Sequence, residues 1–281
     1  MTSTFEQEVK QGDRFTFGEN WRRFLSVLND ERIAEAEKSL KQMLEVEDLQ
    51  GKSFLDIGSG SGLFSLAARR LGAKVHSFDY DPQSVACTQE LKCRYYTDDS
   101  NWTVEQGSVL DVNYLKSLGQ FDIVYSWGVL HHTGAMWQAL ENATLPVADG
   151  GQLFIAIYND QGRKSKLWCK VKQVYCSGIV GRSLISALFI PYFVFRGLAV
   201  DIVKRHNPLV RYTEYKKSRG MSIFHDWYDW LGGYPFEVAK PEEIFLLYRH
   251  KGLVLENLIT DGGGLGNNQF VFTKQCSKSL S

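Results

Sequence analysis

The chain has 281 residues, of which 44% are hydrophobic and 23% are charged, and its formal net charge is +0. This composition is ordinary for a soluble globular protein and excludes a largely disordered chain. The charge is unevenly spread, because residues 161–220 hold 13 Lys and Arg against 2 Asp and Glu, a net of about +11. Such asymmetry is typical of a surface that meets an anionic partner.

Two further features of the composition indicate a reducing compartment. The five cysteines form an odd set without a C-x-x-C pair, which argues against a disulfide framework or a zinc ribbon. Residues 1–15 are polar and contain no apolar stretch of the kind found in secretory signals. We therefore expect a cytoplasmic protein.

The opening segment, residues 16–49, is predicted to be helical, because its apolar residues recur near helical spacing. From residue 53 onward, short apolar runs alternate with helical stretches. The runs are apolar on both faces, as in strands of a mostly parallel sheet that helices cover. The predicted strands are residues 53–57, 74–78, 102–105, 121–125 and 152–158, and the helices between them are residues 63–71, 82–95, 112–118 and 136–145.

The alternation stops after residue 158 and resumes with a helix at 241–251. Strands at 254–260 and 269–273 follow, joined by a glycine-rich turn. We predict a Rossmann-like, doubly wound, mostly parallel α/β sheet with an inserted helical cap after the fifth strand. The expected parts are an N-terminal helical segment (1–50), a cofactor-binding core (51–158), a basic and apolar cap (159–240), and a C-terminal helix and strand pair (241–281).

The strongest local signal is a glycine turn between the strand at 53–57 and the helix at 63–71. Gly58, Gly60 and Gly62 permit a tight turn and let a ligand approach the backbone, and the helix start offers free N–H groups. An ordinary strand-to-helix turn is the alternative. Leu63 stands where dinucleotide-binding turns have Gly or Ala, which disfavours a dehydrogenase.

Polar residues follow the next three strands in the same way. Asp79 ends the second strand, where a carboxylate can accept both hydroxyls of a ribose, and Asp81 is expected to cap the next helix. Ser108 and Val109 follow the third strand, where an adenine edge could be read. Ser126 ends the fourth strand beside the glycine turn. These features fit one ligand that lies across the carboxyl ends of the strands.

As a set, these motifs resemble those of class I S-adenosylmethionine-dependent methyltransferases. The resemblance rests on residues 55–62, Asp79, residues 107–108 and residues 121–124, which occur in order within residues 53–158. Within that class the chain is most similar to the ubiquinone-biosynthesis O-methyltransferase and its small-molecule relatives.

The resemblance implies S-adenosylmethionine as the cofactor. Asp56 and the glycine turn would hold its methionine part, and Asp79 its ribose. Many family members have an aspartate where Ser108 stands, and Asp111 is either a substitute or a helix cap. Arg32 lies in a segment similar to one whose arginine pairs with the cofactor carboxylate, and a surface arginine is the alternative. The predicted cofactor-binding residues are Arg32, Asp56, Gly58, Ser59, Gly60, Gly62, Asp79, Tyr80, Ser108, Val109 and Ser126.

Three histidines are candidates for a general base. Methyl transfer to oxygen or nitrogen usually requires removal of a proton, and histidine has a suitable pKa. His131 and His132 follow the fourth strand, and we favour His132, although packing is an equal alternative. His225 begins an aromatic run, residues 225–230, that forms either a substrate wall or the core of the cap. A metal site built on these histidines is disfavoured, so no metal is expected.

The cap contains a strongly apolar stretch, residues 184–200, with Pro191 and Arg196 inside it. A spanning helix needs about twenty apolar residues, so we expect this stretch not to cross a membrane. Its basic surroundings, residues 163–219, suit peripheral membrane contact or a pocket for an amphiphilic or anionic substrate. In the quinone enzyme an insertion after the fifth strand is also tied to membrane contact. The alternative is a buried helical cap with solvated lysines.

The predicted function is S-adenosylmethionine-dependent methyl transfer to a small molecule, most readily to oxygen, with carbon and nitrogen left open. Aromatic and basic residues are interleaved between residues 212 and 230, so an RNA-modifying methyltransferase is one alternative, although nucleic acid fits the apolar stretch poorly. A catalytically idle protein that binds the same cofactor is the other.

Overall fold

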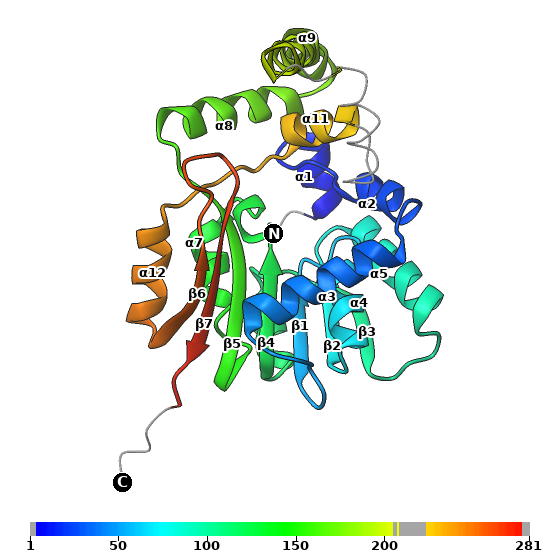
Figure 1. Cartoon of the computed structure of the whole chain (residues 1–281), viewed down its shortest axis with the longest axis vertical. Helices are drawn as coiled ribbons and strands as arrows, with labels where there is room; N and C mark the ends of the chain where they lie inside the picture. The colour runs from blue at the N-terminus through cyan, green and yellow to red at the C-terminus, as the bar shows by residue number, and fades with distance from the viewer. Residues whose placement is uncertain (1–3, 205–206, 208–222, 277–281) are drawn as a thin grey trace.

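A seven-stranded sheet forms the centre of the computed structural model, which describes residues 4–204, 207 and 223–276 (Figure 1). The strand order is β3-β2-β1-β4-β5-β7-β6. All neighbours are parallel except β7, which is antiparallel to both β5 and β6. The strands are β1 (Ser53–Ile57), β2 (Lys74–Asp79), β3 (Trp102–Gln106), β4 (Phe121–Trp127), β5 (Val147–Tyr158), β6 (Leu253–Ile259) and β7 (Asn267–Lys274).

Helices cover both faces of this sheet, and each face has its own apolar core. The strands are buried on both sides, as the neighbouring β1 residues Phe54 and Leu55 illustrate, since they point to opposite faces and are both fully buried. The doubly wound, mostly parallel fold is therefore confirmed. One face is covered by α3 (Asp30–Leu44), α4 (Leu63–Arg70) and α5 (Pro82–Tyr95), and the other by α6 (Val112–Ser117), α7 (Met136–Asn142) and α12 (Pro241–His250).

The N-terminal segment differs from the single helical stretch that the sequence indicates. It forms α2 (Gly18–Leu25) and α3, separated at Asn29, whose side chain accepts a hydrogen bond from the backbone N–H of Arg32 and so caps α3. A further helix, α1 (Phe5–Gln11), precedes them. It is short and polar, so hydrophobic periodicity does not reveal it.

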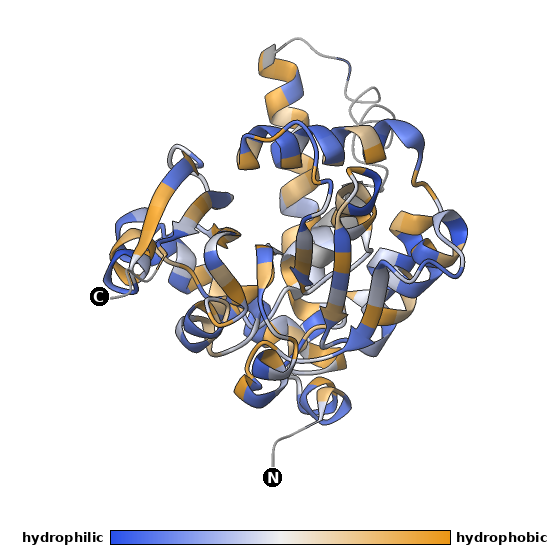
Figure 2. Cartoon of the chain, turned by 90° about the horizontal axis from the view of Figure 1, so that it is seen from below, coloured by the Kyte–Doolittle hydropathy of each residue, from blue (hydrophilic) through white to orange (hydrophobic). Residues whose placement is uncertain are grey.

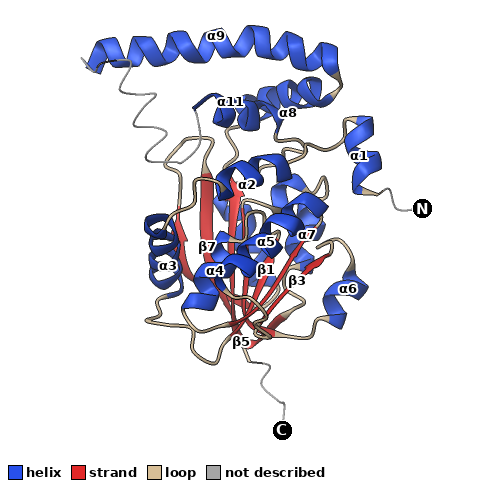
Figure 3. Cartoon of the chain, turned by 90° about the vertical axis from the view of Figure 1, so that its right-hand side faces the viewer, coloured by secondary structure: helices blue, strands red, loops and turns tan. Residues whose placement is uncertain are grey.

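The inserted cap is helical, as expected, and lies beyond the carboxyl ends of the strands (Figure 3). It comprises α8 (Arg163–Cys176), α9 (Ile179–Lys204) and α11 (Ile223–Gly232). These helices share a small apolar core of their own, with Val171, Tyr175, Ile185 and Leu231 buried in it. The helix α9 continues through Pro191 without a break. Within the described residues, α9 is the one helix long and apolar enough to cross a membrane by length and composition.

Candidate functional site

A cavity of about 1420 Å³ lies at the carboxyl ends of strands β1 to β5. The N-terminal helices α1 and α2 form one wall of it, and residues of α8 and α11 form another. Of the predicted site residues, those that line this cavity are Asp56, Gly58, Ser59, Gly60, Asp79, Tyr80, Ser108, Val109 and His132. The structure thus brings together residues from four separate strand ends.

The glycine turn forms the floor of the cavity. Gly58, Gly60 and Gly62 all have positive φ angles, of 80°, 55° and 79°, which residues with a side chain rarely adopt. A Cβ atom at Gly58 would lie 2.4 Å from Cγ1 of Val129, so the turn also needs glycine for space. Gly62 does not line the cavity but caps α4. The backbone N–H groups of Gly58 and Ser59 donate to the carbonyl oxygen of Phe78, which holds the turn in this shape.

Asp56 stands at the end of β1 and is almost fully buried. Its Oδ2 accepts a 2.5 Å hydrogen bond from Oγ of Ser65. Burial raises its pKa to about 7, although the hydrogen bond from Ser65 opposes this. Tyr125 pairs with Asp56 across β1 and β4, and its buried hydroxyl has no hydrogen-bond partner among the described residues. Both side chains therefore offer polar atoms to a bound molecule.

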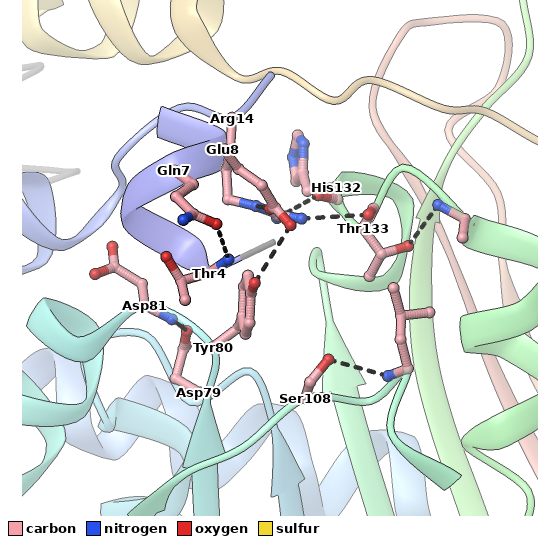
Figure 4. Close-up of polar contacts among 12 residues, drawn as sticks. Thr4, Gln7, Glu8, Arg14, Asp79, Tyr80, Asp81, Ser108, His132 and Thr133 are labelled. Atoms are coloured by element: carbon pink, nitrogen blue, oxygen red, sulfur yellow. Dashed lines mark hydrogen bonds and ion pairs between the residues drawn. The ribbon is translucent and has the colours of Figure 1, made fainter. Parts of the chain in front are cut away.

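Asp79, at the end of β2, holds the glycine turn in place. Its Oδ2 accepts a 2.9 Å hydrogen bond from the backbone N–H of Gly60. Its Oδ1 accepts one of the same length from the backbone N–H of Asp81 (Figure 4). Burial raises its pKa to about 6, against the effect of these hydrogen bonds. Asp81 accepts from the N–H of Gln83 and caps α5, which confirms that prediction.

The wall after β3 carries the residues expected to read adenine. Oγ of Ser108 accepts a hydrogen bond from the N–H of Leu110, and the amide of the Asn142 side chain donates to the carbonyl oxygen of Val109. These contacts fix the shape of the loop. Asp111 accepts from two backbone N–H groups at the start of α6, so its role as a helix cap is established.

His132 lines the cavity beside Phe17 and Tyr158. Its Nδ1 lies 2.6 Å from the carbonyl oxygen of Pro235. Since a carbonyl oxygen only accepts, Nδ1 carries the proton and Nε2 keeps a lone pair. Burial lowers the pKa of His132 to about 3, and the charges of Lys172 and Arg14 add to this effect. The imidazole is therefore neutral near pH 7.

His131 is fully buried and does not line the cavity. Its Nδ1 accepts a 3.3 Å hydrogen bond from the N–H of Tyr158, whose ring packs against it with centroids 4.1 Å apart. Its Nε2 has no partner among the described residues. Burial lowers the pKa of His131 well below its usual value. This position makes His131 a link between the end of β4 and the end of β5.

Three other predicted site residues lie away from the cavity or outside the described part. Arg32 donates to the carbonyl oxygen of Val27 and lies over the ring of Phe24, so α3 directs it along the protein surface. Ser126 is fully buried and donates to the carbonyl oxygen of Ile57, because alternation along β4 turns it into the sheet. The side chain of His225 falls outside the described residues.

Arg14, which the sequence did not indicate, closes the cavity on the side of the N-terminal helices. Its guanidinium bonds Glu8 at 2.6 Å and donates to the carbonyl oxygens of His132 and Thr133 at 2.9 and 3.3 Å. It also lies 5.0 Å above the ring of Tyr80, which donates to the other oxygen of Glu8 (Figure 4). One residue thus joins α1, the end of β2 and the loop after β4.

Lys172 is the second residue that was not anticipated. It is 1% exposed, donates to the carbonyl oxygen of Trp230, and lies 4.3 Å from the ring centre of Trp230 and 4.9 Å from that of Phe236. A cation held between aromatic faces in a buried place is stabilised by the ring quadrupoles. The spacing of Trp168, Lys172 and Tyr175 on one face of α8 is the signal that could have placed it inside.

Two tryptophans of the aromatic run, Trp227 and Trp230, also line the cavity. The aromatic run therefore contributes to the wall, next to Lys172 and Tyr158. Among the described residues, no group of three or more His, Cys, Asp or Glu side chains could hold a metal ion.

Comparison with known families gives a match over the middle of the chain. Residues 55–153 match a family described as a methyltransferase domain. The ribosomal protein L11 methyltransferase of Anoxybacillus flavithermus is 33% identical over 117 residues, 37% of each chain. That of Methylococcus capsulatus is 52% identical over 71 residues, which are 25% of this chain and 24% of the relative. The matched region thus spans about a third of the length of the first relative and about a quarter of the second.

Solved structures share the fold over most of the chain. Magnesium protoporphyrin IX methyltransferase from Synechocystis PCC 6803 with bound SAH has a TM-score of 0.52 at 12% identity, covering 98% of this chain and 90% of that one. An O-methyltransferase family protein from Burkholderia thailandensis has a TM-score of 0.53 at 12% identity, covering 98% and 68%. At this level of identity the likeness concerns the fold.

Proposed function

We propose that this chain, whose residues 55–153 match a methyltransferase domain, is an S-adenosylmethionine-dependent methyltransferase that acts on an oxygen atom of a small molecule. The observation that carries the proposal is a single cavity with two kinds of wall. The glycine turn and two buried acids lie on one side, and His132, Lys172 and aromatic rings lie on the other. The first side suits the cofactor and the second an acceptor.

The cofactor side fits S-adenosylmethionine on three counts. The glycine turn, residues 58–61, lines the cavity at the start of α4, where a helix N-terminus suits the carboxylate of a ligand. Asp56 and Asp79 are buried acids with raised pKa values, and a cationic ligand compensates their charge. The unpartnered hydroxyl of Tyr125 faces the same space.

Each cofactor-side residue then has a role. The turn and Asp56 hold the methionine part, and Asp79, already fixed by two backbone N–H groups, accepts from the ribose. Ser108 and Val109 line the adenine side. When bound, S-adenosylmethionine supplies a methyl group on a good leaving group, so the protein mainly has to align the acceptor and exclude water.

The acceptor side favours an aromatic or amphiphilic molecule with an acidic hydroxyl. Nε2 of His132 accepts a hydrogen bond from that hydroxyl and so orients its oxygen toward the methyl group. Because the pKa of His132 is low, this nitrogen is unprotonated at neutral pH and ready to accept. The Lys172 cation favours the ionised form of an acidic hydroxyl, whose proton passes to solvent because the pKa of His132 is too low for the imidazole to keep it. Trp227 and Trp230 provide flat apolar surface.

The experiment that tests this proposal is incubation of cell extracts with the protein and methyl-labelled S-adenosylmethionine, followed by mass spectrometry. We expect one labelled small molecule, methylated on oxygen, and release of S-adenosylhomocysteine. Label on a ribosomal protein would instead favour protein methylation, the activity for which the curated relatives are named. Label on RNA, with RNA affinity that falls steeply with salt, would favour nucleic-acid modification. Cofactor binding without product in any extract would indicate an idle protein.

A further inference from the structure

The helix α9 exposes a stripe of large apolar side chains at four-residue spacing. Val180, Leu184, Leu188 and Phe195 are 83%, 63%, 64% and 69% exposed, and Tyr192, between the last two, is 50% exposed. A side chain repeated every three or four residues lies on one face of a helix. Only 6% of the most apolar window of α9 is buried. Monomeric soluble proteins rarely expose such a continuous apolar surface, so this face marks an interaction site.

The opposite face of α9 is packed on the cap. Ile185 is buried, and Phe189 and Phe193 pack against Trp168 of α8 with ring centroids 5.3 and 6.3 Å apart. Phe193 also contacts Trp227 of α11. Figure 3 shows α9 lying across α8 and α11, at the side remote from the sheet. A helix that is held at Ile185, Phe189 and Phe193 presents its other side to solvent.

The surroundings of the stripe are basic. Residues 161–200 contain no Asp or Glu. Arg182 and Arg196 of α9 are exposed, and so are four residues of α8: Arg163, Lys164, Lys166 and Lys170. Figure 2 shows the end of α9 that leads into the grey trace as a mostly apolar helix that extends past the rest of the ribbon. An apolar stripe rimmed by cations complements the acyl boundary and headgroups of an anionic bilayer.

We propose that α9 docks the protein on an anionic lipid bilayer, lying in the interface with Val180, Leu184, Leu188 and Phe195 inserted and the basic residues of α8 and α9 on the headgroups. The protein is held on one side of the membrane, since α8 and α11 cover the inner face of α9. Lys172 and Trp230 of those two helices line the cavity, so docking holds the acceptor side near the bilayer.

The test is co-sedimentation of the full chain with vesicles, which requires no methyl transfer and is therefore independent of the proposed function. We expect binding at low salt to vesicles of phosphatidylcholine and phosphatidylglycerol, and weaker binding to phosphatidylcholine alone. In the double variant Leu188→Gln/Phe195→Gln the affinity should fall about tenfold or more, because two inserted apolar side chains are lost. Both residues are exposed, so the fold is retained.

The matched control is Leu246→Gln/Leu258→Gln, which removes two exposed apolar residues of α12 and β6 and should bind as the unaltered chain does. Three outcomes would overturn the proposal. The first is no binding to anionic vesicles at low salt, and the second is equal binding by both double variants. The third is a dimer in light scattering that Leu188→Gln/Phe195→Gln dissociates while vesicle binding is absent, which would assign the stripe to a second copy of the chain.

Discussion

Asp56 and Asp79 lie at the ends of adjacent strands, and burial raises the pKa of each, to about 7 and about 6. Each acid therefore holds a proton over a range where an exposed aspartate is ionised. Asp79 also raises the pKa of Asp56 through its charge. A cationic ligand that enters between them favours the ionised form of both, so ligand binding and proton release are coupled.

This coupling predicts how cofactor affinity depends on pH. As the pH rises through about 6 and then about 7, the affinity for S-adenosylmethionine should increase, by at most about tenfold per pH unit for each acid, and then level off. The free energy of unfolding of the ligand-free protein should respond oppositely, because a raised folded-state pKa stabilises only the protonated form and that contribution is lost as the pH rises. Titration calorimetry in two buffers of different ionisation enthalpy measures the protons released. An affinity that does not change over this range would contradict the assignment.

The substitution Asp79→Asn tests the ribose contact with the least change in shape. It removes the charge while keeping a carbonyl oxygen for one of the two backbone N–H groups. We expect cofactor affinity to fall by about 1–3 kcal/mol, the scale of a lost charge-assisted hydrogen bond. Asp111→Asn is the control, because Asp111 also lines the cavity but serves as the cap of α6. Calorimetry that finds equal affinities for the two variants would remove Asp79 from the site.

His132→Gln should lower kcat by about 10²-fold with the acceptor found in extracts, because the hydrogen bond that orients the acceptor hydroxyl toward the methyl group is lost. Cofactor affinity should stay within about twofold, since His132 lies on the acceptor side. His131→Gln is the comparison, because His131 is buried away from the cavity. It should lower thermal stability more than it lowers the kcat of the folded enzyme. Full activity in His132→Gln would mean that another group orients the acceptor hydroxyl.

The sequence predicts correctly the site residues that directly follow strand ends, and it predicts the other site residues poorly. Asp56, Asp79 and Ser108 follow strand ends, so their meeting at one edge follows from the parallel sheet. Ser126 lies on the same edge, but the two-residue alternation of β4 turns it inward. Arg14 acts through backbone carbonyls of a distant loop, and no local pattern encodes such a contact.

Among the secondary-structure elements, α1 and the loop after β4 are joined by a single side chain. Arg14 reaches two carbonyl oxygens of that loop while its partner Glu8 holds it from α1. The carbonyls belong to His132 and Thr133, next to the acceptor side of the cavity. Arg14 therefore holds the N-terminal helices against the loop after β4.

Arg14→Gln should weaken the contact between the N-terminal helices and the loop after β4. We expect faster dissociation of S-adenosylhomocysteine and a loss of about 1–3 kcal/mol in the free energy of unfolding, because two buried carbonyls lose a charged donor. Stopped-flow displacement measures the first effect and urea unfolding the second. Arg23→Gln removes an exposed i,i+4 ion pair in α2 and serves as the control, which should change neither quantity appreciably. If S-adenosylhomocysteine dissociates equally slowly from both variants, α1 does not slow the release of the ligand from the cavity.

The elements themselves were predictable to different degrees. The five strands β1 to β5 and the helices between them lie close to the predicted bounds, because apolar runs and turn residues mark each one. Sequence patterns set no bounds for α9, which runs through Pro191 without a break, and Phe189 and Phe193 pack against Trp168 of α8 on either side of the proline. Tertiary contacts of that kind cannot be predicted from a short stretch of sequence.

At the scale of the whole molecule, the cavity is lined both by the strand ends of the sheet and by residues of the helical cap. A ligand that contacts both should stabilise the whole chain. S-adenosylhomocysteine at about one hundred times its dissociation constant should add about 2.7 kcal/mol and raise Tm by about 5–10 °C. NAD at the same concentration should leave Tm unchanged, because the turn lacks the dinucleotide spacing. Differential scanning fluorimetry that shows the reverse order would favour a dehydrogenase.

The position of β7 has a consequence for how the chain is made. This strand lies between β5 and β6 in the sheet but follows α9 in the chain, so the sheet cannot close until α9 has left the ribosome. Until α11 has also been made, α9 packs against α8 alone, and its exposed stripe and the surface that contacts Trp227 are both open to solvent. Apolar surface that is exposed during synthesis is prone to aggregate, which chaperones prevent. Synthesis without them should yield aggregates rather than folded protein, even where the purified chain refolds in dilute solution.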